Sequence, residues 1–322
     1  MTSGYDFAAV TPSTPSAGLP TVGFVGAGKG GQTLAAGLAH AGVRVVAVAS
    51  RSRESAMRLA ALAGVPASGV YSRAAEVPAA AQLTLLTVPD DAIAAAVEEI
   101  CRAGGWHPGH GVVHCSGALP SSLLDCARAE GSPAASFHPL QAFAARPADV
   151  AAAAAQLRGI VYGLEGDALL MPALDRMVRL LGGWPLPLQA AIKPLYHAAA
   201  VIASNYAVTL VATGADLLAR CGLEPDAAVR ALLPLLAGTL TNLTTLGVPE
   251  ALTGPLSRGD TGTVARHLDH LDAVAPEAAT LYRSLGLVTL PIALHKNPAV
   301  AGQLAAARVL LTQLPGDPEP PE

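Results

Sequence analysis

The sequence predicts an α/β protein in which a doubly wound, mostly parallel sheet is followed by an all-helical second domain. Short apolar segments alternate with helical segments as far as Leu188, which is the pattern of a parallel sheet covered by helices on both faces. Beyond Leu188 the remaining segments all have helical periodicity. We therefore expect a sheet domain at 21–188, a helical domain at 189–314, and flexible proline-rich tails at 1–20 and 315–322.

Composition and charge narrow the class of protein. The 322 residues suffice for two domains, and a content of 52% hydrophobic and 14% charged residues excludes a disordered chain. The net charge of −4, with no basic run, argues against a nucleic-acid partner. Four cysteines without a C-x-x-C pair, and no visible signal peptide, indicate reduced thiols in a cytoplasmic protein.

The stretch 22–31 organises the first domain. An apolar strand at 22–25 runs into a loop in which Gly26, Gly28 and Gly31 fit the G-x-G-x-x-G pattern, and a helix is expected at 32–40. The first glycine allows a sharp turn, the second lets a pyrophosphate approach the backbone, and the third allows close helix packing. Because a helix N-terminus also faces the phosphates, the loop predicts a dinucleotide site. Its expected binding residues are Gly26, Ala27, Gly28, Lys29, Gly30 and Gly31, with Val88 and Pro89 beside the nicotinamide.

The residues after the second strand, 43–49, indicate which dinucleotide binds. An NAD-preferring site usually places a carboxylate here to hold the ribose hydroxyls. This chain has Ser50, Arg51 and Ser52 instead, whose hydroxyl and guanidinium groups suit a 2′-phosphate. The sequence therefore predicts NADP(H), although a solvated basic turn would look the same.

Further strands and helices follow in alternation. A helix at 56–63 is closed by Gly64, and Asp90 or Asp91 is expected to cap a helix at 92–101. The other expected strands are 69–71, 82–88, 111–115, a strand that ends near His138, 160–164 and 184–188. The other expected helices are 121–130 and 169–181 in the first domain, then 194–220, 225–246, 261–271, 276–285 and 299–314.

Polar groups at strand ends and on one helix are the candidates for chemistry. Ser116 follows one strand, and His138 ends another before a proline that imposes extended backbone. On the helix at 194–220, His197 and Ser204 share a face with Asn205 at its flank. We interpret this polar stripe as facing the substrate, although hydrogen bonding between helices is the alternative.

The long helix at 194–220 also raises the question of a membrane. No Asp, Glu, Lys or Arg occurs from Pro194 to Ala215. The polar residues within it, and the many alanines, favour a helix buried in protein, so we expect no membrane span. Its apolar surface predicts a homodimer.

Seven motifs together resemble a family of Rossmann-like proteins with a helical C-terminal domain of unknown function, similar in layout to pyrroline-5-carboxylate reductase, β-hydroxyacid dehydrogenases and prephenate dehydrogenase. The motifs are the glycine loop, Ser50-Arg51-Ser52, His114 to Gly117, Phe137 to Leu140, Lys193 to His197, Ser204-Asn205, and Leu252 to Asp260. The resemblance implies NADP-linked oxidoreductase chemistry, commonly in a dimer, without a settled substrate.

The resemblance also carries over to particular residues. Lys193 and the residue four later resemble the lysine and asparagine pair of β-hydroxyacid dehydrogenases, but here that residue is His197, and Pro194 makes Lys193 a helix cap. His138 and Pro139 are similar to the His-Pro element of prephenate dehydrogenase, whose histidine contacts the substrate hydroxyl. Lys193, His197 and His138 are therefore the candidate proton donors, with Ser116 and Asn205 orienting the substrate.

Two other groups of residues remain open. One is the loop before the helix at 261–271, which contains Thr253, Gly254, Arg258 and Asp260. Either Arg258 binds an anionic substrate there, or Asp260 only caps the helix. His107, His110 and His114, or His267 and His270, have metal-ligand spacings, but a solvated surface explains them better, and we expect no metal.

The sequence as a whole predicts an NADP(H)-dependent oxidoreductase that transfers a hydride to or from a small, anionic carbonyl, hydroxy or imino compound. The alternative is a sensor or scaffold that binds NADP(H) without turnover, as the incomplete lysine–asparagine pair would suggest. A deazaflavin cofactor is not distinguished by these residues.

Overall fold

The computed structural model describes residues 18–313 and divides into two compact units, Met1–Ser204 and Asn205–Glu322. The predicted tails at 1–20 and 315–322 lie outside the described residues, except for residues 18–20, of which Leu19 packs against the core. The division falls after Ser204, further along the chain than the domain boundary expected at Leu188, and the domain limits remain a prediction.

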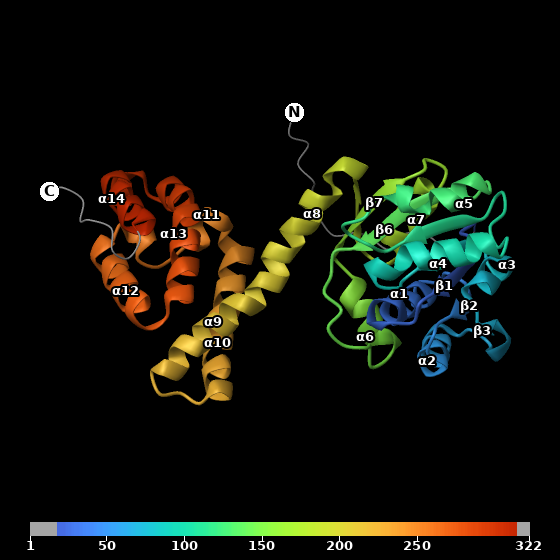
Figure 1. The fold of residues 1–322 in the computed structure, drawn as a ribbon, viewed down its shortest axis with the longest axis horizontal. Coiled ribbons are helices and arrows are strands. Elements are labelled where there is room, and N and C mark those ends of the chain that lie inside the picture. The colour runs from blue at the N-terminus through green and yellow to red at the C-terminus, as the bar shows by residue number, and fades with distance from the viewer. Residues whose placement is uncertain (1–17, 314–322) are drawn as a thin grey trace. The chain divides into compact units, whose positions relative to one another are not determined.

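The first unit is built on one eight-stranded sheet with the order β3-β2-β1-β4-β5-β6-β7-β8 (Figure 1). All pairs from β3 to β6 are parallel, and the order reverses between β1 and β4, as in a doubly wound fold. The strands are β1 (Val22–Val25), β2 (Val45–Ala49), β3 (Val70–Tyr71), β4 (Leu83–Leu86), β5 (Gly111–His114), β6 (Ala134–Pro139), β7 (Val161–Gly166) and β8 (Trp184–Pro187).

Two strands at the β6 edge run against the rest of the sheet. β7 pairs antiparallel with β6, placing His138 opposite Gly163, and β8 then pairs parallel with β7. Between β6 and β7 lies a helix that the sequence reading omitted, α6 (Val150–Leu157), which begins at Asp149 because its carboxylate accepts a hydrogen bond from the Ala152 N–H. The predicted fold class, a mostly parallel sheet followed by helices, is confirmed.

Helices cover both faces of the sheet and bury two separate cores. One core packs α1, α2, α6 and α7 against the sheet through residues such as Leu38, Leu59 and Leu174. The other packs α3 and α4 against the opposite face through Val77, Ile93 and related apolar residues. The remaining helices of this unit are α1 (Lys29–His40), α2 (Arg53–Ala63), α3 (Val77–Ala80), α4 (Asp90–Arg102), α5 (Asp125–Ala129), α7 (Met171–Leu180) and α8 (Lys193–Ala200), which continues into a π-helical turn at Val201–Asn205.

A side chain caps the N-terminus of α2, but none caps the N-terminus of α4. Ser52 caps α2 by accepting from the Ser55 N–H, and Gly64 ends it with a left-handed φ of 71°, as glycine allows. The expected capping of α4 by Asp90 or Asp91 is wrong, because the cap is Pro89 and no side chain caps the helix. Asp90 is instead drawn to Ser116, 26 residues away, whose hydroxyl donates to it at 2.6 Å.

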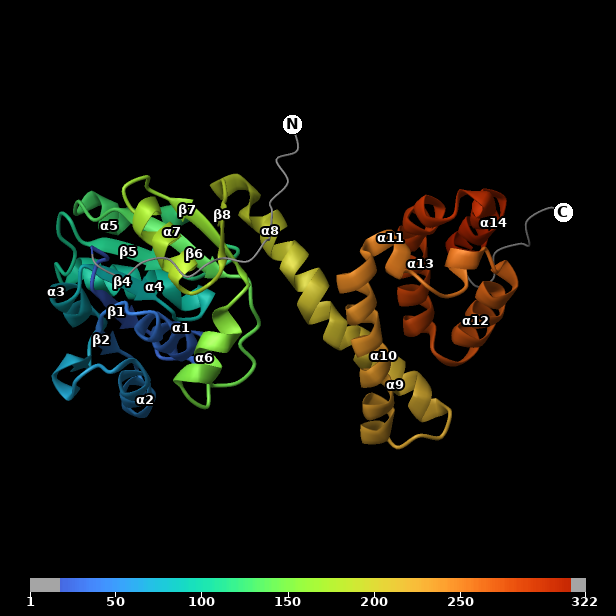
Figure 2. The same ribbon diagram turned by 180° about the vertical axis from the view of Figure 1, so that it is seen from behind.

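As far as residue 313, the regular elements of the second unit are all helices (Figure 2). Helices α12, α13 and α14 enclose an apolar core that includes Val264, Leu290 and Leu304, and α9 packs on α10. The helices are α9 (Tyr206–Arg220), α10 (Pro225–Leu246), α11 (Val248–Ala251), α12 (Thr261–Val274), α13 (Pro276–Lys296) and α14 (Ala301–Thr312). α13 extends well past the expected end at 285, because Pro291 is accommodated inside it.

The expectation of four reduced cysteines is wrong for one pair. Cys101 at the end of α4 and Cys126 in α5 form a disulfide, while Cys115 and Cys221 are free. Their separation of 25 residues gave no local signal, since only the packing of α4 against α5 brings the two side chains together.

Candidate functional site

The glycine loop lies at the carboxyl end of β1, and each glycine has its own steric reason. Gly26 has a φ of 103°, and a Cβ there would lie 2.7 Å from the Thr87 backbone. A Cβ on Gly31 would lie 2.6 Å from Thr87 Oγ1 and 2.8 Å from the Gly26 carbonyl oxygen. Nothing lies within 4 Å of a Cβ placed on Gly28, so the fold does not need glycine there. The open approach at Gly28 suits a pyrophosphate that lies directly on the backbone.

A cavity of about 600 Å³ opens in front of this loop. It contains most of the residues expected to bind a dinucleotide, including Arg51 and Ser52, and its charged lining is Lys29, Arg51, Arg146 and Glu99. Its volume and mixed lining are typical of a cofactor site. The predicted residues in its wall are Gly26, Ala27, Gly28, Lys29, Ser50, Arg51, Ser52, Val88 and Pro89.

A smaller cavity of about 160 Å³ adjoins the first, since Thr87 and Val88 line both. Its wall brings the glycine loop and the end of β6 together, with His138 on one side and Cys115 and Asp90 also exposed to it. Other residues that line the smaller cavity are Gly30, Gly31, Gln141 and Phe143. Thr87 and Val88 thus lie in the walls of two neighbouring cavities, one lined by the Ser50–Ser52 turn and the other by His138.

His138 is held between α8 and the loop after β5. Its Nδ1 lies 2.9 Å from the Tyr196 hydroxyl, and its ring centre lies 6.3 Å from that of His197. A Cβ on Gly117 would lie 2.8 Å from His138 Nε2 and 2.9 Å from His197 Cδ2. Glycine at 117 therefore makes room for both imidazoles.

Burial sets the protonation of the His138–Tyr196 pair. Desolvation, and then the neighbouring Lys193 and His197, lower the pKa of His138 to about 4, so the imidazole is neutral at pH 7. Burial raises the pKa of Tyr196 to about 12, with the Gly163 N–H opposing it, so the phenol keeps its proton. The pair therefore carries a hydroxyl donor and a neutral imidazole at neutral pH.

Lys193 lies in the interior rather than in either cavity. Its side chain is 0% exposed, and its Nζ donates to the Ser116 carbonyl oxygen at 3.1 Å and to the Ser136 hydroxyl. Desolvation lowers its pKa, and the negative Glu165 is the first group that opposes this shift. Lys193 thus ties α8 to β6 and to the loop after β5.

Ser116 shapes the turn that follows β5. Its hydroxyl donates to Asp90 and accepts the backbone N–H groups of Ala118 and Leu119 at 3.2 and 3.1 Å. Its own N–H donates to His114 Nδ1 at 3.1 Å. With these partners the Ser116 side chain holds the turn in place, and Gly117 follows beside His138.

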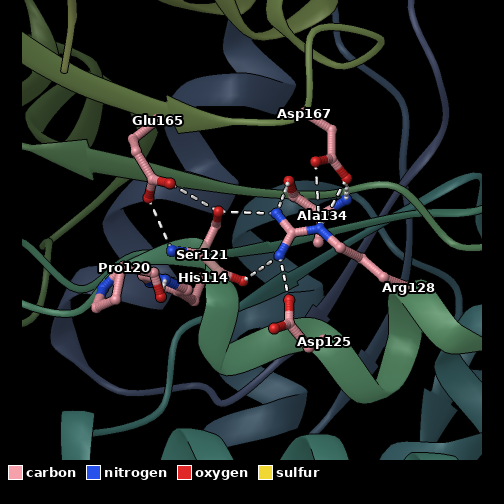
Figure 3. Close-up of polar contacts among 8 residues, drawn as sticks. All are labelled: His114, Pro120, Ser121, Asp125, Arg128, Ala134, Glu165 and Asp167. Carbon is pink, nitrogen blue, oxygen red and sulfur yellow. Dashed lines mark hydrogen bonds and ion pairs between the residues drawn. The ribbon is translucent and has the colours of Figure 1, made fainter. Parts of the chain in front are cut away.

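The same loop is anchored at its far end by the charged network of Figure 3. Glu165 accepts from the Ser121 N–H and hydroxyl, both at 2.7 Å. Arg128 lies between Asp125 and Asp167 and also donates to Ser121 and to the Ala134 carbonyl oxygen (Figure 3). Partial burial raises the pKa of Asp167, but hydrogen bonds from Arg128 and Ala134 outweigh it and lower that pKa overall.

Several predicted site residues belong to the second unit. Asn205 begins that unit and is exposed. Asp260 caps α12, because its carboxylate accepts from the Thr263 N–H at 2.9 Å and from the Thr263 hydroxyl at 2.8 Å. Arg258 and Thr253 are exposed, and Gly254 takes a φ of 95°. Capping therefore accounts for Asp260.

The histidines considered for a metal have other partners. His110 is buried and bonds to the Ala81 carbonyl oxygen and to Thr84, and His114 bonds to the Pro120 carbonyl oxygen. His267 contacts the Tyr282 hydroxyl. Within residues 18–313, no three His, Cys, Asp or Glu side chains are grouped to hold a metal ion.

The sequence reading missed Gly117, Tyr196, Asp90 and Arg146 as members of the site. Asp90 had a usable signal, since it follows the carboxyl end of β4, but its position before a helix favoured the capping interpretation. Tyr196 is next to His197 in a motif already noted. Arg146 lies in a segment without periodicity, and no local pattern indicates that it reaches a cavity formed by β1 and β2.

Comparison with known proteins agrees with this architecture. Residues 12–139 match the family described as a Rossmann-like domain, and residues 160–289 match the domain of unknown function DUF2520. No curated protein matches the chain.

Solved structures extend the likeness over most of the chain. A Bacteroides fragilis protein described as an NADP oxidoreductase is 26% identical, with a TM-score of 0.67 over 84% of this chain and 98% of that one. A Thermotoga maritima protein is 25% identical, with a TM-score of 0.66 over 86% and 99% of the two chains. A pyrroline-5-carboxylate reductase from Coxiella burnetii, 14% identical with a TM-score of 0.54 over 91% and 98%, shows the fold alone. The resemblance drawn from the motifs is confirmed: the chain joins a Rossmann-like domain to a DUF2520 domain and shares its fold with NADP oxidoreductases.

Proposed function

We propose that the protein is an NADP(H)-dependent oxidoreductase acting on a small, anionic carbonyl, hydroxy or imino compound. The observation that carries this proposal is a pair of cavities that share Thr87 and Val88, one lined by the Ser50–Ser52 turn and part of the glycine loop, the other by Gly30, Gly31 and His138. When bound, NADP(H) supplies or accepts a hydride at its nicotinamide ring. The name of the Bacteroides fragilis neighbour, an NADP oxidoreductase, agrees with this chemistry.

Different groups of residues would bind different parts of the dinucleotide. The backbone of Gly26 to Gly31 and the N-terminus of α1 hold the pyrophosphate, because free N–H groups and the positive helix end face it. Ser50, Arg51 and Ser52 hold the 2′-phosphate. Val88 lines both cavities and Pro89 the larger one, and the nicotinamide end would meet the substrate beside them.

His138 supplies the proton that accompanies the hydride. The phenol of Tyr196 keeps its proton at neutral pH, so it donates to His138 Nδ1 and leaves the imidazole hydrogen on Nε2. Nε2 lies against Gly117 and donates to the substrate oxygen or nitrogen. As Nε2 gives up its proton, Nδ1 takes the proton of Tyr196, which leaves a neutral imidazole and a phenolate. Uptake of a solvent proton at Nε2 and return of the Nδ1 proton to Tyr196 restore the starting pair.

Lys193, His197 and Ser116 support this pair. Lys193 is a positioning residue, because its ammonium group is buried and fixes the loop that carries Ser116 and Gly117. His197 is half-buried beside His138 and adds a second imidazole toward an anionic substrate. Asn205, Thr253, Gly254 and Arg258 remain proposed substrate contacts, whereas capping of α12 accounts for Asp260.

Exchanging Arg51 for aspartate tests the cofactor assignment. We expect Arg51→Asp to weaken NADPH binding about a hundredfold in calorimetry, because a charge-assisted contact becomes a repulsion. NADH binding should be unchanged or tighter, since a carboxylate at this place suits free ribose hydroxyls. Unchanged NADPH affinity would show that the assignment is wrong.

Gly28→Ala is the matched comparison for Arg51→Asp. Because no atom lies within 4 Å of the added Cβ, the variant should melt at the wild-type temperature. It should bind NADPH and NADH equally poorly, since its methyl group blocks the pyrophosphate that both share.

The rival function is a sensor or scaffold that binds NADP(H) without turnover. A screen of NADPH oxidation and NADP⁺ reduction against keto acids, imines and hydroxy acids separates the two. Turnover that disappears in His138→Ala excludes the sensor, whereas tight binding without turnover across the panel favours it.

We further propose a homodimer formed through the helical domain. Large apolar side chains are exposed on α9 and α10, with Val208 72%, Leu235 70% and Leu240 57% accessible. The stretches Ala190–Arg220 and Pro225–Leu246 are long and apolar enough to cross a membrane on length and composition alone, but polar residues interrupt both. A second copy is therefore the proposed cover, and light scattering should report the mass of two chains. A monomer mass would contradict it.

A further inference from the structure

The segment 141–149 lies between β6 and α6, contributes Arg146 to the lining of the larger cavity, and is held by side chains of other elements. Lys29 Nζ donates to the Ala144 carbonyl oxygen at 2.7 Å, and Arg58 Nη2 donates to the Pro147 carbonyl oxygen at 3.2 Å. The Phe143 ring lies 3.2 Å from the position of a Cβ on Gly30. Two cations thus hold carbonyl groups on either side of Arg146. A residue so closely bracketed loses little further backbone freedom when it binds a ligand.

Arg146 is turned toward the beginning of α2. Its side chain lines the larger cavity, and its Nη2 lies 3.4 Å from the Ser55 hydroxyl. Ser55 belongs to the first helical turn, where its N–H donates to the Ser52 hydroxyl at 3.2 Å. Arg146 and Arg51 therefore reach the same end of the cavity from different sides, one from the segment after β6 and the other from the end of β2.

The charges in this cavity are unevenly spread. Within the described part of the chain, neither Arg51 nor Arg146 forms an ion pair with a carboxylate. Glu99 lines the cavity from α4, and Lys29 already donates to a carbonyl group. Two unpaired guanidinium groups beside a helix N-terminus form a site for a doubly charged phosphate, and the carboxylate disfavours the α4 side.

We propose that Arg146 is a specificity-determining residue that grips the 2′-phosphate of NADP(H) opposite Arg51. The inference rests on the proposed function and adds to it a second cation, contributed by the segment 141–149. Arg146 makes up to two parallel hydrogen bonds to phosphate oxygens, as the planar guanidinium group allows. NADH lacks this phosphate, so Arg146 raises the preference for NADP(H).

Calorimetry of full-length Arg146→Ala with NADPH and NADH tests the proposal. We expect NADPH to bind about tenfold more weakly and NADH to bind as in the wild type. Arg146→Lys should lie between the two, because it keeps the charge and loses the fork. The fragment adenosine 2′-monophosphate should lose affinity by the same factor as NADPH, and adenosine 5′-monophosphate should lose none.

Arg44→Ala is the control, because it removes the same charge from the exposed residue before β2, at the strand end opposite to the cavity, and should change neither affinity. If Arg146→Ala weakens NADPH and NADH equally, Arg146 acts on the pyrophosphate or on the fold, and the proposal fails while the proposed function stands. Unchanged affinity for both NADPH and NADH in Arg146→Ala would also contradict the proposal and leave the proposed function standing. A wild-type protein that binds neither dinucleotide overturns the proposed function together with this inference.

Discussion

Replacing His138 with alanine should lower kcat by about two to four orders of magnitude on any substrate found to be turned over. The reason is that a positioned proton donor contributes roughly this factor, and His138 lines the smaller cavity. Steady-state kinetics measure the loss, and calorimetry should show that NADPH still binds. Tyr196→Phe should give a smaller loss with an altered pH profile, because Nδ1 then lacks its hydroxyl partner at 2.9 Å.

The control for His138 is His40→Ala, which removes an exposed histidine at the end of α1. It should leave kcat and KM at wild-type values. Full activity in His138→Ala would exclude the His138 imidazole as the proton donor and would leave His197 as the candidate imidazole.

Acidification should destabilise the protein steeply between pH 6.5 and pH 4. Burial is the main cause that lowers the pKa of His110, His114 and His138 to about 4 each, whereas the unfolded chain binds these protons near pH 6.5. The unfolded state therefore takes up more protons as the pH falls, and stability present above pH 6.5 is lost on the way to pH 4. Each histidine contributes about 3 kcal/mol, which is a large part of a typical folding free energy.

Chemical denaturation at a series of pH values measures this effect. The slope of the unfolding free energy near pH 5 should correspond to nearly three protons, and His110→Gln should lower it by about one. A free energy that stays level from pH 6.5 to pH 4.5 would contradict the buried, neutral state of these histidines. The lowered pKa of Asp167 affects stability only below its ordinary value of 3.8, outside this window.

Local patterns were sufficient for much of the fold. The strand at 22–25, the glycine loop and the helix Pro225–Leu246 appear in the structure with the expected bounds, because apolar periodicity, glycine and proline act over a few residues. Patterns of this range also placed Arg51 and Ser52 beside the glycine loop, since a βαβ unit brings its first two strands together.

What local patterns could not decide was which distant groups meet. Asp90 was expected to cap its own helix, but the Ser116 hydroxyl reaches it across the sheet. Lys193 was expected to face the substrate, but its ammonium group is buried between the Ser116 carbonyl oxygen and Ser136. Hydrogen bonds of this kind join residues dozens of positions apart, so their partners depend on how the strands are ordered.

The sequence by itself therefore determined the fold class, the position of the glycine loop and the polar, basic turn at Ser50–Ser52. Each of these depends on backbone conformation and spacing within a short stretch of chain. Only the tertiary structure decided that His138 pairs with Tyr196, that Cys101 pairs with Cys126, and that Arg146 reaches the cavity. These outcomes depend on the packing of elements far apart in the chain, and burial then sets the protonation of His138 and Tyr196 in the pair.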